Sequence, residues 1–284
     1  MTKSILNFNG GLDSTYVLWK TLSQTDEEVT ALTFKFSGDN QSPATVRLGE
    51  DHQDVKLTIV DSMANWLKTN VRSFNHVVID FDPSYLDDAV SFEDATFKKT
   101  TEIYLVKYGI QNGFDKIISS FEKDNDGFSA ASTTFDVDKR RTPLSGEMRG
   151  AFKRMAKSGE ISFMLLDMNY HQAYAIRELP VALFNMTRSC DAETSEPCGV
   201  CFKCSKRQFF MKCIADGKTN ADIQSIIDNE SLTNDGRWIS MKWWLRDHVG
   251  TYKSFAGKND DTDPVYNKEK QVWAMPLWPP SLKL

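Results

Sequence analysis

Short apolar runs alternate with amphipathic segments along most of the chain. Apolar runs with the length of one buried strand cover residues 4–8, 29–36, 77–81 and 116–121. Apolar side chains recur at helical spacing over residues 14–22, 64–71, 95–111 and 144–157. Residues 37–54 and 122–138 are polar and predict loops. Strands that alternate with helices predict an α/β fold with a doubly wound parallel sheet.

The pattern changes towards the end of the chain. Residues 161–166 are apolar, and periodicity leaves both a strand and the start of an apolar helix open. Helical spacing returns over residues 205–216, 221–228 and 238–249, with Gly217 as a predicted helix stop and Thr219 as the next cap. Residues 273–280 are rich in Trp and Pro. Because proline interrupts a regular helix, we expect an extended tail there that packs against the body or a partner.

A glycine turn lies between the first predicted strand and the first predicted helix. It reads Asn9-Gly10-Gly11-Leu12-Asp13-Ser14-Thr15. Glycines let the backbone approach an anion closely, and the start of a helix carries partial positive charge. Ser14 and Thr15 add hydroxyl donors, and Asp13 is placed to cap the helix. The turn therefore predicts a phosphate site at the carboxyl end of the first strand, although it matches neither the Lys-bearing P-loop nor the dinucleotide fingerprint.

Four cysteines form a second cluster, at Cys190, Cys198, Cys201 and Cys204. Seven residues separate the first pair and two separate each later pair. Four thiolates at this spacing can close a tetrahedral zinc site. An iron–sulfur cluster is the chief alternative, because ferredoxins also space three cysteines by two residues. Cys213 shares an apolar helix side with Phe209 and Phe210, so we interpret it as a core residue.

The composition narrows the class of protein. The chain has 284 residues, of which 40% are hydrophobic and 26% charged, and its net charge is −5. This charge argues against direct nucleic-acid binding over a broad surface. No apolar run is long enough to cross a bilayer, and the first residues do not resemble a signal peptide. We therefore expect a cytoplasmic protein, where clustered cysteines bind metal more often than they form disulfides.

These motifs together resemble the 7-cyano-7-deazaguanine synthases, the QueC family of PP-loop ATP pyrophosphatases. That family opens with Ser-Gly-Gly-x-Asp-Ser, which residues 9–14 match except at Asn9. A family Thr-Pro-Leu segment is matched by residues 142–144. The family's Ser-Cys, spacer and Cys-Gly-x-Cys-x-x-Cys-x-x-Arg pattern is matched by residues 189–207. The resemblance covers about residues 3 to 215.

The resemblance implies a reaction and its cofactors. ATP activates the carboxylate of 7-carboxy-7-deazaguanine by adenylation, and ammonia then gives the amide. A second ATP leads to the nitrile. Asn9, Gly10, Gly11, Leu12, Asp13, Ser14 and Thr15 would bind ATP, with Asp13 and Ser14 in the catalytic roles and Ser14 as the firmest donor. Mg²⁺ would neutralise phosphate charge, and Zn²⁺ would sit on Cys190, Cys198, Cys201 and Cys204.

The chain also departs from the family, and the departures keep other functions open. The family's aromatic-Gly-Gln turn is replaced by Phe36-Ser37-Gly38, and residues 122–127 do not reproduce its Tyr-Pro-Asp-Cys-Arg stretch. Besides the QueC reaction, we consider a relative that joins a deazapurine acid to a protein amine in an antiviral system. A non-catalytic nucleotide-binding relative and a tRNA-thiolating PP-loop enzyme are the further alternatives.

The resemblance also suggests the domain boundaries of the chain and its binding partners. We expect a PP-loop nucleotide-binding domain over residues 1–188 and a zinc knuckle with its helix over residues 189–215. We also expect residues 216–284 to form a helical extension with the Trp- and Pro-rich tail. The expected partners are the small deazapurine substrate and ammonia, a second copy in a homodimer, and a protein that the extension could dock.

Overall fold

The computed structural model describes residues 1–35, 50–81, 97–120, 158–162, 164–168, 170–188, 202–231, 265–267 and 272–274. The chain divides into two compact units. The first unit comprises Met1–Tyr170 and Leu179–Arg188, and the second comprises His171–Glu178 and Ser189–Leu284. The three domains predicted from the sequence stay a prediction.

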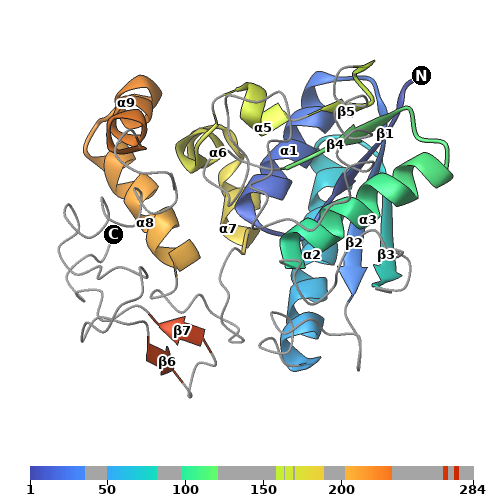
Figure 1. Cartoon of the computed structure of the whole chain (residues 1–284), viewed down its shortest axis with the longest axis horizontal. Helices are drawn as coiled ribbons and strands as arrows, with labels where there is room; N and C mark the ends of the chain where they lie inside the picture. The colour runs from blue at the N-terminus through green and yellow to red at the C-terminus, as the bar shows by residue number, and fades with distance from the viewer. Residues whose placement is uncertain are drawn as a thin grey trace. The chain divides into compact units, whose positions relative to one another are not determined.

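The first unit is built on a five-stranded sheet in the order β3-β2-β1-β4-β5 (Figure 1). Every neighbouring pair in this sheet is parallel. The strands are β1 (Lys3–Asn7), β2 (Glu28–Lys35), β3 (Asn75–Asp80), β4 (Lys116–Ile118) and β5 (Ile161–Ser162). The predicted α/β class with a parallel sheet is confirmed.

Burial along the strands follows their place in the sheet. Six consecutive residues of β2 are buried, as expected for a strand that is covered on both faces. β3 lies at the edge and is only partly buried, with Val78 44% exposed. β1 lies at the centre, where Ile5 and Leu6 are fully buried. The apolar runs of β1 and β2 therefore reflect burial on two faces.

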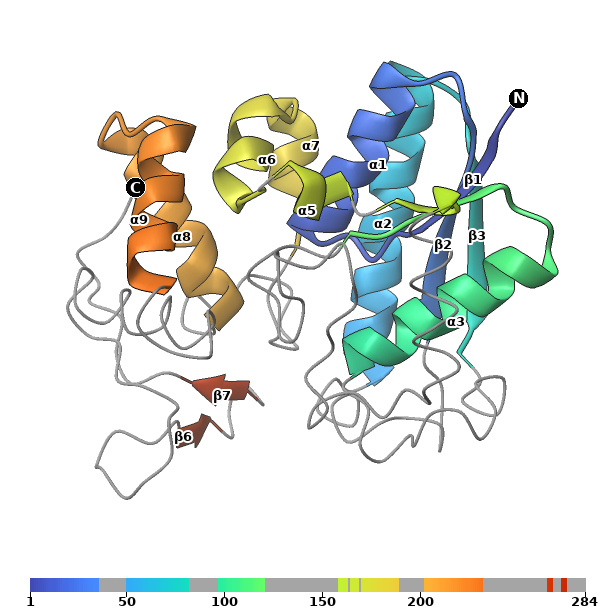
Figure 2. The same ribbon diagram turned by 45° about the horizontal axis from the view of Figure 1, so that its top comes forward.

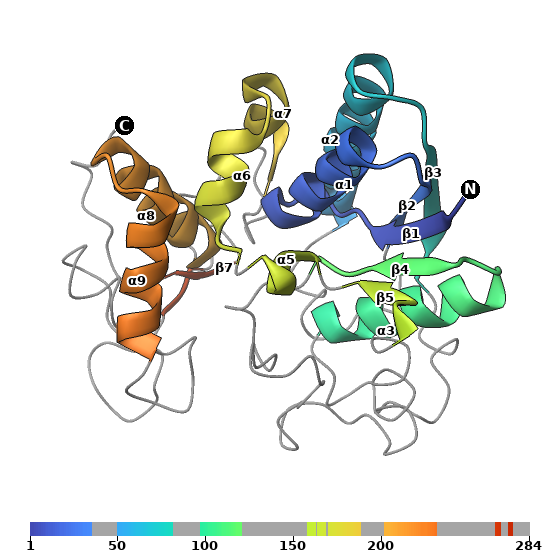
Figure 3. The same ribbon diagram turned by 90° about the horizontal axis from the view of Figure 1, so that it is seen from above.

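Helices cover both faces of this sheet. Figure 3 shows α1 and α2 on one face and α3 on the other. The helices of this unit are α1 (Leu12–Gln24), α2 (Glu50–Asn70), α3 (Phe97–Gln111), α5 (Met164–Asp167) and α7 (Val181–Met186). The doubly wound arrangement that the alternating pattern predicted is therefore present. Among the described residues, no helix has both the length and the apolar character that a bilayer crossing needs.

α3 packs tightly on β1 and β4. A Cβ atom added at Gly109 would lie 2.9 Å from Ile117 Cγ1 and 3.2 Å from Ile5 Cγ2, so the helix backbone approaches the sheet where no side chain fits. Further along the same face, Phe34 meets Tyr104 edge to face at a centroid distance of 5.1 Å. These contacts show that Ile5, Phe34 and Ile117 point to the α3 face.

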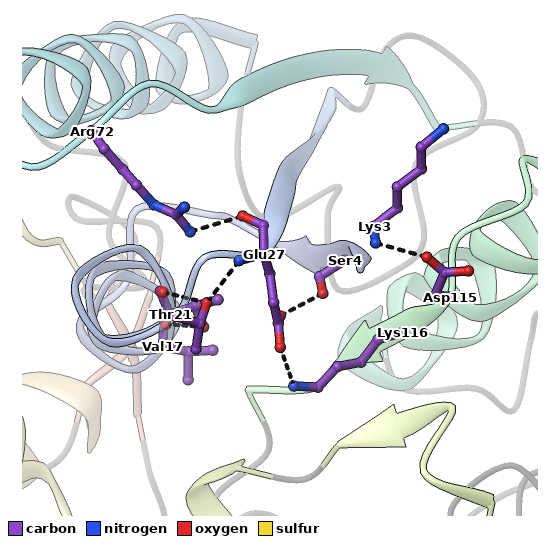
Figure 4. Close-up of polar contacts among 9 residues, drawn as sticks. Lys3, Ser4, Val17, Thr21, Glu27, Arg72, Asp115 and Lys116 are labelled. Atoms are coloured by element: carbon purple, nitrogen blue, oxygen red, sulfur yellow. Dashed lines mark hydrogen bonds and ion pairs between the residues drawn. The ribbon is translucent and has the colours of Figure 1, made fainter. Parts of the chain in front are cut away.

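Polar groups hold the sheet together near the amino ends of β1 and β4 (Figure 4). The carboxylate of Glu27 accepts the Ser4 hydroxyl at 2.5 Å and pairs with Lys116 Nζ at 2.8 Å. Arg72 Nη2 donates to the backbone oxygen of Glu27 at 2.8 Å. The Asp115 carboxylate accepts the backbone N–H of Lys3 at 2.8 Å. This cluster ties β1, β2 and β4 together at the end of the sheet opposite the glycine turn.

Several element boundaries differ from the predictions. The loop predicted over residues 37–54 is wrong for its last part, because α2 already begins at Glu50. Residues 50–54 carry no apolar side chain, so periodicity gives no helix signal there. The strand predicted over residues 116–121 ends at Ile118 in β4. Residues 161–166 contain both open alternatives, since β5 ends at Ser162 and α5 begins at Met164.

The second unit contains three described helices and a small sheet. The helices are α6 (Gln172–Glu178), α8 (Phe202–Ala215) and α9 (Asn220–Ser231), and Figure 2 shows α8 and α9 side by side. β6 (Val265–Asn267) pairs antiparallel with β7 (Val272–Ala274). The expected extended backbone is present at Trp273 and Ala274. The helices predicted over residues 144–157 and 238–249 lie outside the described residues.

The connection from α8 to α9 follows its sequence signals. Gly217 has a φ of 75°, and Lys218 N donates to Cys213 O at 3.0 Å, which ends α8. Thr219 and Asp222 then cap α9 reciprocally: Thr219 N donates to Asp222 Oδ2 at 2.7 Å, and Asp222 N donates to Thr219 Oγ1 at 3.1 Å. The predictions of a stop at Gly217 and a cap at Thr219 are confirmed.

His171 is a core residue of the second unit. It is fully buried, and its ring stacks on Phe210 at a centroid distance of 5.4 Å with the planes 7° apart. His171 Nε2 lies 3.1 Å from the backbone oxygen of Asn220. Cys213 is also buried, at 3% exposure, as expected for a core residue.

Candidate functional site: the glycine turn after the first strand

The glycine turn begins directly beyond the carboxyl end of β1. β1 pairs with β2 on one side and with β4 on the other. The chain builds β2 and β3 outwards in one direction and then crosses to place β4 on the opposite side of β1. The carboxyl ends of β1 and β4 therefore form the topological switch point of the sheet, which is where parallel α/β sheets bind ligands.

Gly10 gives the turn its shape. Its φ of 73° lies in the left-handed region, which side chains with a Cβ atom rarely adopt. An added Cβ would also approach Val60 Cγ2 of α2 to 2.9 Å. The backbone oxygen of Gly10 accepts the N–H of Arg188 at 2.8 Å. The turn therefore packs closely against α2 and is hydrogen-bonded to the segment after α7.

Asn9 and Ser14 close the turn through their side chains. Asn9 Oδ1 accepts the backbone N–H of Gly11 at 2.9 Å and the hydroxyl of Ser14 at 2.8 Å. The backbone N–H of Asn9 donates to Ser14 Oγ at 3.4 Å. Asn9 is exposed, whereas Ser14 is only 2% exposed. In this arrangement the single hydroxyl proton of Ser14 is used within the turn, and Asn9 is its nearest acceptor.

Leu12 and Thr15 face inwards. Both are fully buried. The Thr15 hydroxyl and backbone N–H both donate to Gly11 O, at 2.7 and 3.0 Å, so this residue fastens the first turn of α1. The side chains of Leu12 and Thr15 thus belong to the core, and it is the backbone at these positions that a ligand above the turn would meet. Their predicted part in ATP binding stays a prediction.

Asp13 does not cap α1, and the capping prediction is wrong. The helix begins at Leu12 with Gly11 as its N-cap, so Asp13 already lies in the first turn. Its carboxylate instead accepts the hydroxyl of Tyr170, with Oδ1 2.8 Å from the phenolic oxygen. Tyr170 is 1% exposed and stacks on Tyr16 at a centroid distance of 5.3 Å. A carboxylate near a helix N-terminus still interacts favourably with the helix dipole.

Sequence reasoning missed Tyr170 and Arg188 as neighbours of the turn. Tyr170 stands 157 positions from Asp13 in the chain, and no local spacing links the two. Arg188 is a cationic residue that is only 7% exposed, and its backbone N–H donates to Gly10 O. The only sequence signal for Arg188 is its position just before the cysteine segment.

Thr33 and His76 form a chain of hydrogen bonds that ends at the backbone of Phe8, directly after β1. Thr33 donates its hydroxyl to Phe8 O at 2.6 Å, and His76 Nε2 lies 2.9 Å from Thr33 Oγ1. Because the Thr33 proton is directed to Phe8, His76 Nε2 must be the donor in this pair. Burial lowers the pKa of His76 from 6.5, opposed by Asp61 and assisted by Lys68. Burial thus favours the neutral form of His76, and the contact with Thr33 favours the tautomer with its proton on Nε2.

The predicted metal ligands lie outside the described part of the chain. Cys190, Cys198 and Cys201 are not among the described residues, and Cys204 is described only as a backbone position of α8. Among the described residues, no three His, Cys, Asp or Glu side chains gather into a metal-binding group. The four-cysteine site therefore stays a prediction.

No protein-family model and no curated protein sequence matches the chain. Among solved structures it is similar to the U34-tRNA thiolase NcsA from Methanococcus maripaludis with its 4Fe-4S cluster, at 10% identity and a TM-score of 0.32, covering 95% of this chain and 80% of that chain. It is also similar to NAD+ synthetase from Burkholderia pseudomallei, at 14% identity and a TM-score of 0.20, covering 79% and 77%. At TM-scores this low, neither likeness supports a conclusion about this chain.

Proposed function

We propose that this chain is an ATP-dependent enzyme of the PP-loop type, which binds the phosphates of ATP over residues 9–15. One observation carries the proposal. A turn with a left-handed glycine follows the central strand at the switch point of a parallel sheet and leads into the amino end of α1. Each of these features favours a bound phosphate, and they coincide at one place.

The residues of the turn would have different roles in binding ATP. Gly10 and Gly11 let the backbone approach phosphate oxygens, and the amino end of α1 contributes partial positive charge. Ser14 would donate to the departing pyrophosphate after its hydroxyl turns away from Asn9. The part-exposed carboxylate of Asp13 is the type of ligand that Mg²⁺ takes alongside substrate phosphates. When bound, Mg²⁺ would supply charge neutralisation at those phosphates.

The reaction we propose is the QueC type. The carboxylate of 7-carboxy-7-deazaguanine attacks the α-phosphorus of ATP, and pyrophosphate leaves. Ammonia attacks the acyl carbon, AMP leaves, and the amide forms. The oxygen of the amide then attacks the α-phosphorus of a second ATP and pyrophosphate leaves, after which loss of AMP and protons yields the nitrile. The chain's task at each stage is to orient the nucleotide and stabilise the leaving group, without a side-chain nucleophile.

The test is product analysis on the purified full-length protein. We expect AMP and pyrophosphate only when ATP, Mg²⁺ and the deazapurine acid are all present, and amide or nitrile only when ammonium is added. Ser14→Ala is expected to slow turnover on the order of a hundredfold, the effect of removing one donor from a developing charge. ATP that binds but stays intact with this acid would contradict the adenylating activity and favour a nucleotide-binding protein.

A further inference from the structure

The last residue of β1, Asn7, has a buried side chain whose oxygen does not stabilise the fold by a hydrogen bond to the described residues. Asn7 is 8% exposed, and its side-chain oxygen finds no hydrogen-bond partner within the part of the chain that the structure describes. A buried amide oxygen without a partner lowers stability, and a central strand normally carries an apolar residue at such a position. Among the described residues, no contact of this oxygen explains why the position is polar.

The register shows where the Asn7 side chain points. Alternate residues of a strand share a face, so Asn7 lies on the same face as Ile5, which approaches Gly109 of α3. Leu6 is the register partner of Ile118, and one further step places Asn7 beside Ser119 at the carboxyl end of β4. Asn7 therefore stands on the α3 side of the switch point, between the ends of β1 and β4.

This position immediately precedes the proposed phosphate site in the chain, at the same carboxyl end of β1. Only Phe8 and Asn9 separate Asn7 from Gly10. A nucleotide whose phosphates lie over the turn must place its nucleoside beside it, over the carboxyl ends of the strands. A buried carbonyl oxygen there accepts a hydrogen bond, so its complement is a donor group on the ligand.

We propose that the carboxamide of Asn7 is a specificity-determining group that accepts a hydrogen bond from the nucleoside part of the bound nucleotide. The donor is a ribose hydroxyl or the exocyclic amine of the base. This inference rests on the proposed nucleotide site. It explains why the buried side-chain oxygen of Asn7 has no partner among the described residues, because the ligand supplies that partner.

The test measures nucleotide affinity and unfolding in parallel on the full chain. Asn7→Leu keeps the branching at Cγ and removes the carbonyl. Ser4→Ala is the matched control, because Ser4 is a buried polar residue of the same strand whose hydroxyl is used by Glu27. We expect Asn7→Leu to bind ATP about tenfold more weakly while its unfolding midpoint in urea stays equal or rises. Ser4→Ala should show the reverse: a lower midpoint and unchanged affinity.

Nucleotide analogues then identify the donor. The 2′-deoxy and 3′-deoxy forms of ATP test the ribose hydroxyls, and the triphosphate of purine riboside tests the exocyclic amine. Wild type should bind one of these about tenfold more weakly than ATP, and Asn7→Leu should bind that analogue and ATP equally. Equal binding of ATP and all analogues by wild type, or unchanged ATP affinity in Asn7→Leu, would overturn this inference alone. Wild type that binds no triphosphate would overturn the proposed function as well.

Discussion

Tyr170 donates its phenolic hydroxyl to the carboxylate of Asp13 across 2.8 Å, and so links the start of α1 to a residue far along the chain. The ring of Tyr170 is buried against Tyr16, which fixes the direction from which the hydroxyl arrives. Asp13 is therefore held in place by a partner that is itself held by packing. In an enzyme that binds phosphates over this turn, Tyr170 acts as a positioning residue.

The variant Tyr170→Phe tests that role. It removes the hydroxyl and keeps the stacked ring, so we expect the free energy of unfolding to fall by about 1–3 kcal/mol, as for a hydrogen bond to a charged group. Affinity for ATP with Mg²⁺ should fall as well, because Asp13 loses its orientation. Tyr16→Phe is the matched control: it removes the hydroxyl that accepts from Lys20 and leaves Asp13 untouched. Equal losses of affinity in both variants would contradict the positioning role.

The variant Gly10→Ala tests the turn itself. Two effects add: the strain of a left-handed residue, about 1–2 kcal/mol, and the approach of the new methyl group to Val60. Gly113→Ala separates them, because Gly113 has a similar φ of 67° and nothing within 4 Å of its added Cβ. Urea unfolding should show Gly10→Ala as the more destabilised of the two. If both variants lose the same stability, the contact with Val60 is unimportant.

His76 makes part of the stability dependent on pH. Burial lowers its pKa from 6.5 in the folded chain, so the unfolded chain binds a proton more readily. The stability that this residue contributes is complete above about pH 6.5 and is lost as the pH falls towards the folded pKa. Unfolding free energies measured across this range should fall less steeply in His76→Gln, whose amide can still donate to Thr33. An unchanged slope in that variant would exclude His76 as the source.

Cysteine labelling tests the predicted metal site. Burial raises the pKa of Cys213 to about 11, so this thiol should resist alkylation of the native protein at neutral pH. If the four clustered cysteines bind zinc, they should also resist until a chelator is added and then react, while Cys213 stays unmodified. Mass spectrometry of the labelled peptides, with elemental analysis, measures both. Visible absorption with bound iron would instead identify the iron–sulfur alternative.

Much of the first unit could be predicted from the sequence, because strands that are buried on both faces appear as apolar runs. The predictions for β1 and β2 follow from this, and those for α1 and α3 follow from helical spacing. All four agree with the structure within a few residues, as does the prediction for the partly buried edge strand β3. The short helices α6 and α7 were missed. They have seven and six residues and are separated by Leu179 and Pro180, so neither is long enough to show a helical period.

The site was predictable only where its residues are neighbours in the chain. Asn9 to Ser14 form one local motif, and the structure places it beyond the carboxyl end of the central strand β1, where α/β sheets bind ligands. The partners of that motif come from distant segments: Tyr170 contacts Asp13, and Arg188 contacts Gly10. Asn7 was counted within an apolar run, and only its burial in the structure distinguishes it from its neighbours.

The bond between Gly10 O and Arg188 N has a consequence for the chain beyond it. Only Ser189 separates Arg188 from Cys190, so the backbone that enters the cysteine cluster starts from a peptide group anchored on the glycine turn. A shift of the Gly10 backbone would therefore move the Arg188 peptide group through this backbone hydrogen bond, independently of side-chain contacts. If the four cysteines bind zinc, Gly10→Ala should lose it sooner than Gly113→Ala during dialysis against a chelator, and equal retention times would show that a change at Gly10 does not affect the metal site.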